Sequence, residues 1–188
     1  MSTGYKIDDQ SALHFVTFQV VQWADLFTRK IYRDIVIDSL KYCQANKGLE
    51  IYAYVIMSNH IHLMVRSDKE DLSGTIRDLK RHTSKQIILA LEDNSESRRE
   101  WLRMIFRYAA KGHSRNKEYQ VWTHENHAEH IFSQKFIEQK ITYIHYNPVR
   151  AGIVERPEDY LYSSARNYAG LEGLLDAELA VFRWRTVK

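Results

Sequence analysis

The run EIYAYVIMSNHIHLMVR, residues 50–66, predicts two antiparallel strands joined by a tight turn. Residues 50–57 and 60–66 are rich in β-branched and aromatic side chains, which favour strands. Ser58 and Asn59 stand between the two runs as a two-residue turn. The run therefore predicts a β-hairpin, and the rest of the chain is interpreted outward from it.

The second strand of this hairpin carries two histidines, His60 and His62. Because side chains alternate along a strand, both imidazoles share one face with Met64, while the aliphatic residues 61, 63 and 65 share the other. The aliphatic face can pack under helices. The imidazoles would then project side by side from the helix-free face, within reach of one divalent ion. Surface histidines or hydrogen-bonded structural histidines are the alternative interpretation.

Strand and helix patterns flank the hairpin in a regular order. The expected elements are a strand at His14–Trp23, a helix from an N-cap at Thr28 to a stop at Gly48, the hairpin, a helix at Leu72–Leu91, an inserted helix at Arg99–Lys111 and a strand at Glu118–Thr123. With the inserted helix set aside, this is the βαββαβ order of a ferredoxin-like α+β sandwich. Helices would cover one face of its antiparallel sheet, and the other face would be open for a site.

Length and composition are those of one compact domain. The 188 residues are 44% hydrophobic and 27% charged, close to the usage of globular proteins. We expect a single domain over residues 1–188, with its core at about 12–148 and an extension at 149–188. Residues 1–10 lack the features of a signal peptide, and no apolar run approaches the roughly 20 residues of a membrane span. With Cys43 as the single cysteine, a cytoplasmic protein is expected.

A last helix is expected from Ser133 to Asn147, where Pro148 would end it. At 100° per residue, the face toward the core is formed by Ile137, Ile141 and Ile144. Tyr143 and Asn147 lie one turn apart on an adjacent stripe, so both can point at one site, whereas Tyr146 points further away. A surface tyrosine and an asparagine that closes the helix are the alternatives.

A phenol, two imidazoles and a carboxamide together suit phosphodiester cleavage. Tyr143 could attack a phosphate, His60 and His62 could bind a metal ion, and the carboxamide oxygen of Asn147 could complete the coordination. A tyrosine hydroxyl has a pKa of about 10 and is mostly neutral, so its attack needs an aligned phosphate that a metal ion polarises.

Basic side chains lie on the predicted helices where a DNA backbone could bind. The candidates are Lys80, Arg81 and Lys85 on the polar side of the 72–91 helix, Arg103 and Arg107 on the inserted helix, and Arg150 after the last helix. The net charge of +3 is too small to decide whether nucleic acid is the partner. A solvated helix face is the alternative for these positions.

These motifs resemble those of the single-tyrosine HUH transposases, and most closely their REP-associated tyrosine transposase branch. The matching blocks run along nearly the whole chain. They are residues 14–19 (HFVTFQ), 54–65 (YVIMSNHIHLMV), 143–154 (YIHYNPVRAGIV) and 162–168 (YSSARNY).

The resemblance implies a metal-dependent enzyme that cuts and rejoins single-stranded DNA. By that resemblance, His60, His62 and Asn147 bind Mg²⁺ or Mn²⁺, and Tyr143 attacks the scissile phosphate to give a 5′-phosphotyrosine and a free 3′-hydroxyl. The DNA would carry hairpins or palindromic repeats, and the protein would be associated with the nucleoid. Such relatives occur as dimers and as monomers, so a homodimer with a hinge at residues 150–154 stays open.

Two other classes compete with this interpretation. A histidine-triad hydrolase would need a third alternating histidine where Met64 stands, which argues against that class. The serious alternative is a non-catalytic module that stacks single-stranded DNA or RNA on the aromatics of the sheet, as an inactive or repurposed transposase would. A covalent protein–DNA adduct that depends on Tyr143 separates the two hypotheses.

Overall fold

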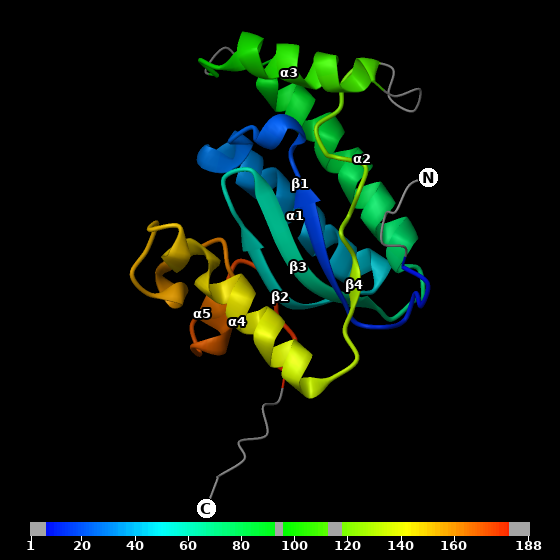
Figure 1. Ribbon diagram of the computed structural model, residues 1–188, viewed down its shortest axis with the longest axis vertical. Coiled ribbons are helices and arrows are strands. Elements are labelled where there is room, and N and C mark those ends of the chain that lie inside the picture. Colours follow the sequence, from blue (N-terminus) through cyan, green and yellow to red (C-terminus); the bar gives the residue numbers. More distant parts are fainter. Residues whose placement is uncertain (1–6, 93–95, 113–117, 181–188) are drawn as a thin grey trace, which may run out of the picture.

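The computed structural model describes residues 7–92, 96–112 and 118–180 (Figure 1). Within them lie β1 (His14–Gln19), α1 (Lys30–Lys47), β2 (Leu49–Ile56), β3 (His60–Ser67), α2 (Leu72–Leu91), α3 (Arg99–Lys111), β4 (Glu129–His130), α4 (Gln134–Arg150) and α5 (Ala165–Tyr168). These strands form one antiparallel sheet in the order β2-β3-β1-β4. The expected α+β class with an antiparallel sheet is confirmed.

The hairpin of β2 and β3 has the predicted turn, and β1 pairs with the other edge of β3. In that register Thr17 lies opposite His62, and Gln19 lies opposite His60. β1 ends at Gln19, four residues before the expected end, because the chain turns at Gln22 and Trp23, which both have a positive φ. Directly opposed residues project to the same face, so Thr17 and Gln19 share a face with the two histidines.

Of the two predicted ends of α1, only the C-terminal end is confirmed. Gly48 adopts a left-handed conformation with φ 65° and closes the helix, as expected, because its N–H donates to the carbonyl of Cys43. Thr28, the expected N-cap, instead belongs to a short 3-10 turn, and α1 begins at Lys30 without a side-chain cap.

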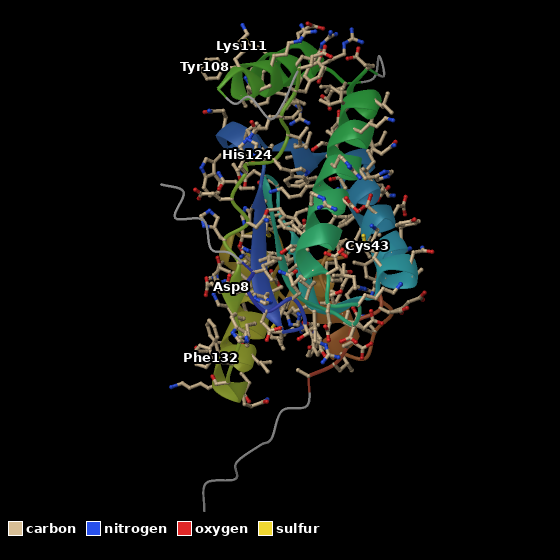
Figure 2. The ribbon with its side chains drawn as sticks, turned by 90° about the vertical axis from the view of Figure 1, so that its right-hand side faces the viewer. Asp8, Cys43, Tyr108, Lys111, His124 and Phe132 are labelled. Atoms are coloured by element: carbon tan, nitrogen blue, oxygen red, sulfur yellow. The ribbon has the colours of Figure 1, made fainter. Side chains whose placement is uncertain are left out.

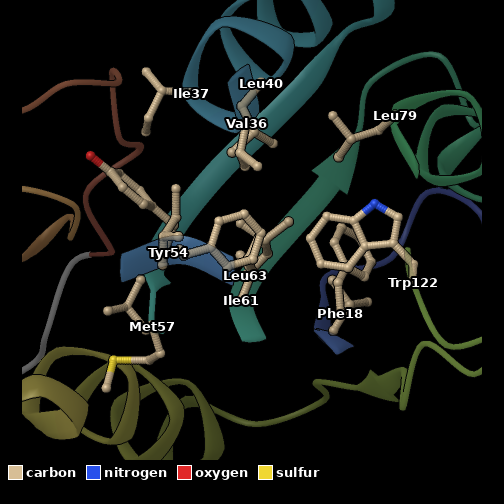
Figure 3. Close-up of a cluster of buried hydrophobic side chains, with 14 of the residues drawn as sticks. Phe18, Val36, Ile37, Leu40, Tyr54, Met57, Ile61, Leu63, Leu79 and Trp122 are labelled. Atoms are coloured by element: carbon tan, nitrogen blue, oxygen red, sulfur yellow. The ribbon is translucent and has the colours of Figure 1, made fainter. Parts of the chain in front are cut away.

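The main core lies between the sheet and the helices α1 and α2. Figure 3 shows Val36 and Leu40 of α1 and Leu79 of α2 over Ile61 and Leu63 of β3. These aliphatic side chains are all buried, so the face of β3 that was predicted to pack under helices does so.

The opposite face of the sheet is not open, which corrects the expectation. Helix α4 packs across β2 and β3, and Figure 3 shows it on the far side of the sheet from α1. As a result both faces of β3 are buried, including His62 and Met64. The expectation failed because α4 is a helix after the βαββαβ unit, and its Ile141 and Ile144 need an apolar surface to cover them.

The predicted strand at residues 118–123 is wrong. Its Val121 and Trp122 are buried, but the segment is irregular and makes only an isolated bridge between Trp122 and Val20. Backbone bonds from Thr123 N–H to the Gln19 carbonyl and from Val21 N–H to the Val121 carbonyl flank that bridge, and the indole N–H of Trp122 donates to Thr83 Oγ1 of α2. The fourth strand is the two-residue β4, paired with the start of β1.

Helix α4 does not end before Pro148, as predicted, but continues to Arg150. A proline lacks only its own N–H and is compatible with helical φ, so the helix can pass through it where packing favours the path. Pro148 is buried, and the carbonyl of Asn147 accepts from Ala151 N–H. The helix therefore extends one turn beyond Asn147.

The segment that follows α4 covers the outer edge of β2. Ile56 N–H donates to the carbonyl of Tyr162, and Ser164 N–H donates to the carbonyl of Tyr54. An edge strand exposes unpaired backbone groups, and here the chain's own C-terminal segment satisfies some of them. No helix in the described ranges is long and apolar enough to cross a membrane.

Candidate active site

The structure brings Tyr143, His60 and His62 together between α4 and the sheet. The rings of His60 and His62 lie 4.7 Å apart between centroids, and the ring of Tyr143 lies 5.2 Å from that of His62. The hydroxyl of Tyr143 is 3.4 Å from Nε2 of His62.

His62 is fixed on both sides of its ring. Its Nδ1 lies 2.8 Å from the hydroxyl of Thr17, and its ring stacks on Phe15 with centroids 5.3 Å apart. Nε2 faces the Tyr143 hydroxyl, and it carries the lone pair in the tautomer in which Nδ1 donates to Thr17. The side chain is 5% exposed, and burial, with smaller contributions from neighbouring cations, lowers the pKa of His62 to about 3. The imidazole is therefore neutral.

His60 is oriented by the turn residue that precedes it. Its Nδ1 lies 2.8 Å from Oδ1 of Asn59, whose Nδ2 donates to Asp25 Oδ1 at 3.0 Å. Because Asn59 donates with its nitrogen, its oxygen must accept, so Nδ1 of His60 carries the proton and Nε2 carries the lone pair. Burial also lowers the pKa of His60. Nε2 of His60 therefore carries a lone pair, and Nε2 of His62 faces the Tyr143 hydroxyl.

Two neutral imidazoles on adjacent positions of one strand face are a donor set that a divalent ion accepts. The described part of the chain contains no cluster of three His, Cys, Asp or Glu side chains that could hold a metal. Asn147 is half-buried one turn after Tyr143 on α4, but no hydrogen bond joins its side chain to either histidine within the described residues.

Tyr143 itself is 40% exposed, so its hydroxyl is accessible while its ring packs against Phe15 and His62. The guanidinium of Arg150 lies 4.7 Å from the centre of the Tyr143 ring, and its Nη2 donates to the Tyr143 carbonyl. The ammonium of Lys140 sits 4.0 Å from the centre of the Phe15 ring. The site is therefore bordered by two cations, which suits an anionic substrate.

The remaining predicted DNA-binding residues lie away from this site. Lys80 is largely buried on α2, where it donates to the carbonyl of Thr123 and to Asn126 Oδ1, and burial lowers its pKa to about 8. Arg81 pairs with Asp78, and Lys85 lines a groove between α1 and α2 together with Arg81. On α3, Arg103 pairs with Glu92 and Arg107 with Glu118. Of the predicted set, only Arg150 contacts Tyr143.

Sequence reasoning missed the residues that orient the histidines. Thr17 and Phe15 lie on a different strand, and the pairing register that sets them beside His62 cannot be read from a single strand pattern. Trp23 was placed in a strand, but it lies in a turn with its ring 6.2 Å from that of His60. The role of Asn59 had one signal in the sequence, which is its position next to His60.

A family model described as "Transposase IS200 like" matches residues 9–140. Among solved structures, that of a REP-associated tyrosine transposase bound to a REP hairpin is similar over 100% of both chains, with a TM-score of 0.60 and 19% identity. At that identity the likeness shows the fold. The crystal structure of a transposase candidate from Deinococcus radiodurans R1 has a TM-score of 0.42 and 14% identity, and covers 77% of this chain and 94% of that one. No curated protein matches the chain in sequence.

Proposed function

This chain belongs to the IS200-like transposase family, and on that premise we propose that it cuts and rejoins single-stranded DNA through Tyr143. The observation that carries the proposal is the hydroxyl of Tyr143, accessible to solvent and 3.4 Å from Nε2 of His62 on the strand that also carries His60. A nucleophile beside two candidate metal ligands is the arrangement that phosphodiester transfer needs.

In the proposed reaction the Tyr143 oxygen forms a bond to the scissile phosphorus and the bond from phosphorus to the 3′ oxygen breaks. The phenolic proton leaves the tyrosine, and the departing 3′ oxygen takes up a proton. The products are a 5′-phosphotyrosine and a free 3′-hydroxyl. Attack of another 3′-hydroxyl on the phosphotyrosine reverses the step and rejoins DNA. This is possible because the phosphotyrosine bond retains the energy of the phosphodiester bond that was broken.

His60 and His62 are the residues that would hold a divalent ion, Mg²⁺ or Mn²⁺, with Asn147 as the proposed third ligand. When bound, the ion would polarise the scissile phosphate. The nitrogen donors favour Mn²⁺ over Mg²⁺, which prefers oxygen ligands. What the chain itself supplies is the orientation: Thr17 and Asn59 hold the two rings through their Nδ1 atoms.

The substrate we propose is single-stranded DNA that folds into a hairpin near the cut, as in the REP-associated branch. The structural neighbour with the same fold was solved with a REP hairpin, and the blocks of sequence quoted above resemble that branch. Among the basic residues, Arg150 is best placed to contact the DNA backbone, because its guanidinium lies over the ring of Tyr143. We also propose that residues 1–188 form one domain, since the C-terminal segment pairs with β2.

The test is the substitution Tyr143→Phe, which removes the nucleophilic oxygen and keeps the ring. With single-stranded hairpin DNA and Mn²⁺, the unsubstituted protein should form a covalent adduct visible on a denaturing gel, and Tyr143→Phe should form none. DNA binding should stay within about twofold, because the substitution removes one hydroxyl.

The matched control is Tyr146→Phe, which alters an exposed tyrosine on the same helix that contacts neither histidine in the described chain. Its adduct should equal that of the unsubstituted protein. An adduct that persists in Tyr143→Phe would defeat the assignment. Binding without any adduct, in every variant, would instead favour the non-catalytic binding module.

A further inference from the structure

A groove of about 730 Å³ opens where β1 ends, on a part of the surface that the proposed chemistry does not use. It is lined by residues of three segments, among them Gln19, Gln22, Tyr108, Lys111, Gln120 and His124. Figure 2 shows Tyr108 and Lys111 near the end of α3, with His124 below them on the same side. Its volume lies in the range of sites for small ligands, roughly 300–1,000 Å³. We call it the β1-end groove.

The β1-end groove begins beside the candidate active site. Gln19 lines the groove and is the register partner of His60 across the sheet. Directly opposed residues of an antiparallel pair have Cβ atoms about 4.5–5.5 Å apart on one face. The groove therefore borders the start of β3, where His60 lies.

The turn between β1 and α1 links the two places physically. Gln22 lines the groove, and the next residue, Trp23, sets its ring edge-on to His60 at 6.2 Å between centroids. Both residues have left-handed backbones, with φ 55° and 52°, which non-glycine residues rarely adopt. Asn59, which orients His60, also donates to the Trp23 carbonyl. The fold thus holds a 60% exposed indole beside the metal-site histidine.

The side chains of the groove suit a nucleobase better than a phosphate. Tyr108 is 70% exposed and offers a flat ring for stacking. Gln19 and Gln22 offer carboxamides, which hydrogen-bond to base edges. Gln120 is buried and its Nε2 donates to the Trp122 carbonyl, so Gln19 and Gln22 are the carboxamides that a base can reach.

We propose that the β1-end groove binds an unpaired nucleobase of the single-stranded substrate next to the scissile phosphate, with Trp23 and Tyr108 as stacking partners. This inference rests on the proposed function, because it takes single-stranded DNA as the ligand. Binding one base beside the cut aligns the neighbouring phosphate with Tyr143. Lys111 adds a cation where the backbone would leave the groove.

The test measures binding without cutting, in a Tyr143→Phe background. The probe is a DNA stem-loop with four unpaired thymidines on each side, in which each thymidine in turn is replaced by an abasic site. One abasic position should weaken binding by about fivefold or more, the low end for loss of one base–aromatic stack. Tyr108→Ala or Trp23→Ala should weaken binding of the intact probe by a similar factor. In these variants the abasic probe should bind only slightly more weakly than the intact probe, because the stack is already lost.

Matched variants separate stacking from damage to the fold. Tyr108→Phe and Trp23→Phe keep a ring and should bind like the parent, whereas Tyr42→Ala removes an exposed ring from α1 and should have no effect. The proposal is overturned if no abasic position matters, or if the abasic effect is undiminished in both alanine variants. If an adduct forms at Tyr143 but no abasic site weakens binding, only the proposed role of the groove is refuted. If an abasic site weakens binding but no adduct forms, only the proposed cutting is refuted.

Discussion

At the scale of single residues, the hydroxyl of Thr17 decides which nitrogen of His62 faces the nucleophile. It lies 2.8 Å from Nδ1, so that Nε2 is the nitrogen beside the Tyr143 hydroxyl. A partner of this kind fixes the tautomer and the ring of a metal-binding histidine. Thr17 is therefore a positioning residue, although it touches neither a proposed metal ion nor DNA.

Replacing Thr17 with Val removes this hydroxyl and keeps the branched shape. We expect the affinity for Mn²⁺, measured by titration calorimetry, to fall about 10- to 100-fold, the usual effect of losing such a partner. Thr17→Ser, which keeps the hydroxyl, should retain the affinity of the unsubstituted protein to within about threefold. Equal affinities in the Val and Ser variants would show that the hydroxyl does not orient the ring.

At the scale of elements, a buried carboxylate anchors the connection between α2 and α3. Glu96 accepts hydrogen bonds from the Tyr32 hydroxyl of α1 and from the backbone N–H of Arg98. The guanidinium groups of Arg98 and Arg29 neutralise its charge. The position of α3, which supplies Tyr108 to the β1-end groove, thus depends on one polar cluster at its start.

The substitution Glu96→Gln should lower the free energy of unfolding by about 1–3 kcal/mol, because buried donors lose a charged acceptor. Urea denaturation measures the change. Glu100→Gln, in the first turn of α3 and exposed, should change the free energy by less than about 0.5 kcal/mol. A Glu96 variant as stable as the Glu100 variant would mean that the cluster does not hold the connection.

At the scale of the whole molecule, α4 and the C-terminal segment wrap the second face and the edge of the sheet. They meet at His145 of α4, whose Nε2 lies 2.8 Å from Ser164 Oγ, while Ser164 Oγ accepts from the N–H of Tyr54 in β2. His145 is buried, and this burial lowers its pKa from 6.5 to about 4. The wrapping therefore depends on a neutral imidazole.

This predicts a loss of stability in acid. The unfolded chain binds the proton of His145 with a pKa of 6.5 and the folded chain with about 4. The contribution of neutral His145 to the free energy of unfolding is complete above pH 6.5 and is lost as the pH falls toward 4. Between pH 7 and 5 the share of the loss that comes from His145 should be about 2 kcal/mol, and urea denaturation at each pH measures the total loss, to which the buried His62 also contributes.

In His145→Asn the decrease in stability between those two pH values should be smaller by about that amount. His82→Asn, which replaces an exposed histidine on α2, should leave the decrease as it is in the unsubstituted protein. If the decrease is the same in all three proteins, His145 is not the group that titrates.

The hairpin, the bounds of α2 and α3, and the pairing of Tyr143 with His60 and His62 could be predicted from the sequence. The hairpin and the helix bounds depend on periodicity, which is local in the chain, whereas the pairing of Tyr143 with the histidines depends on the resemblance of blocks spread along the chain. The strand at residues 118–123 could not be predicted correctly. Its buried Val121 and Trp122 resemble a strand in pattern, but the segment makes only an isolated bridge to Val20, and the Trp122 indole bonds to Thr83 of α2.

The sequence by itself determined the α+β class, the strand face that carries both histidines, and Tyr143 as the candidate nucleophile. The covering of that face by α4, the contacts of Thr17 and Asn59 with the two rings, and the groove lined by Gln19 and Gln22 follow from tertiary packing. The two groups of features differ in the distance along the chain over which they are set. Alternation and helical spacing are properties of neighbouring residues, whereas strand register and the packing of α4 are settled by contacts between distant segments.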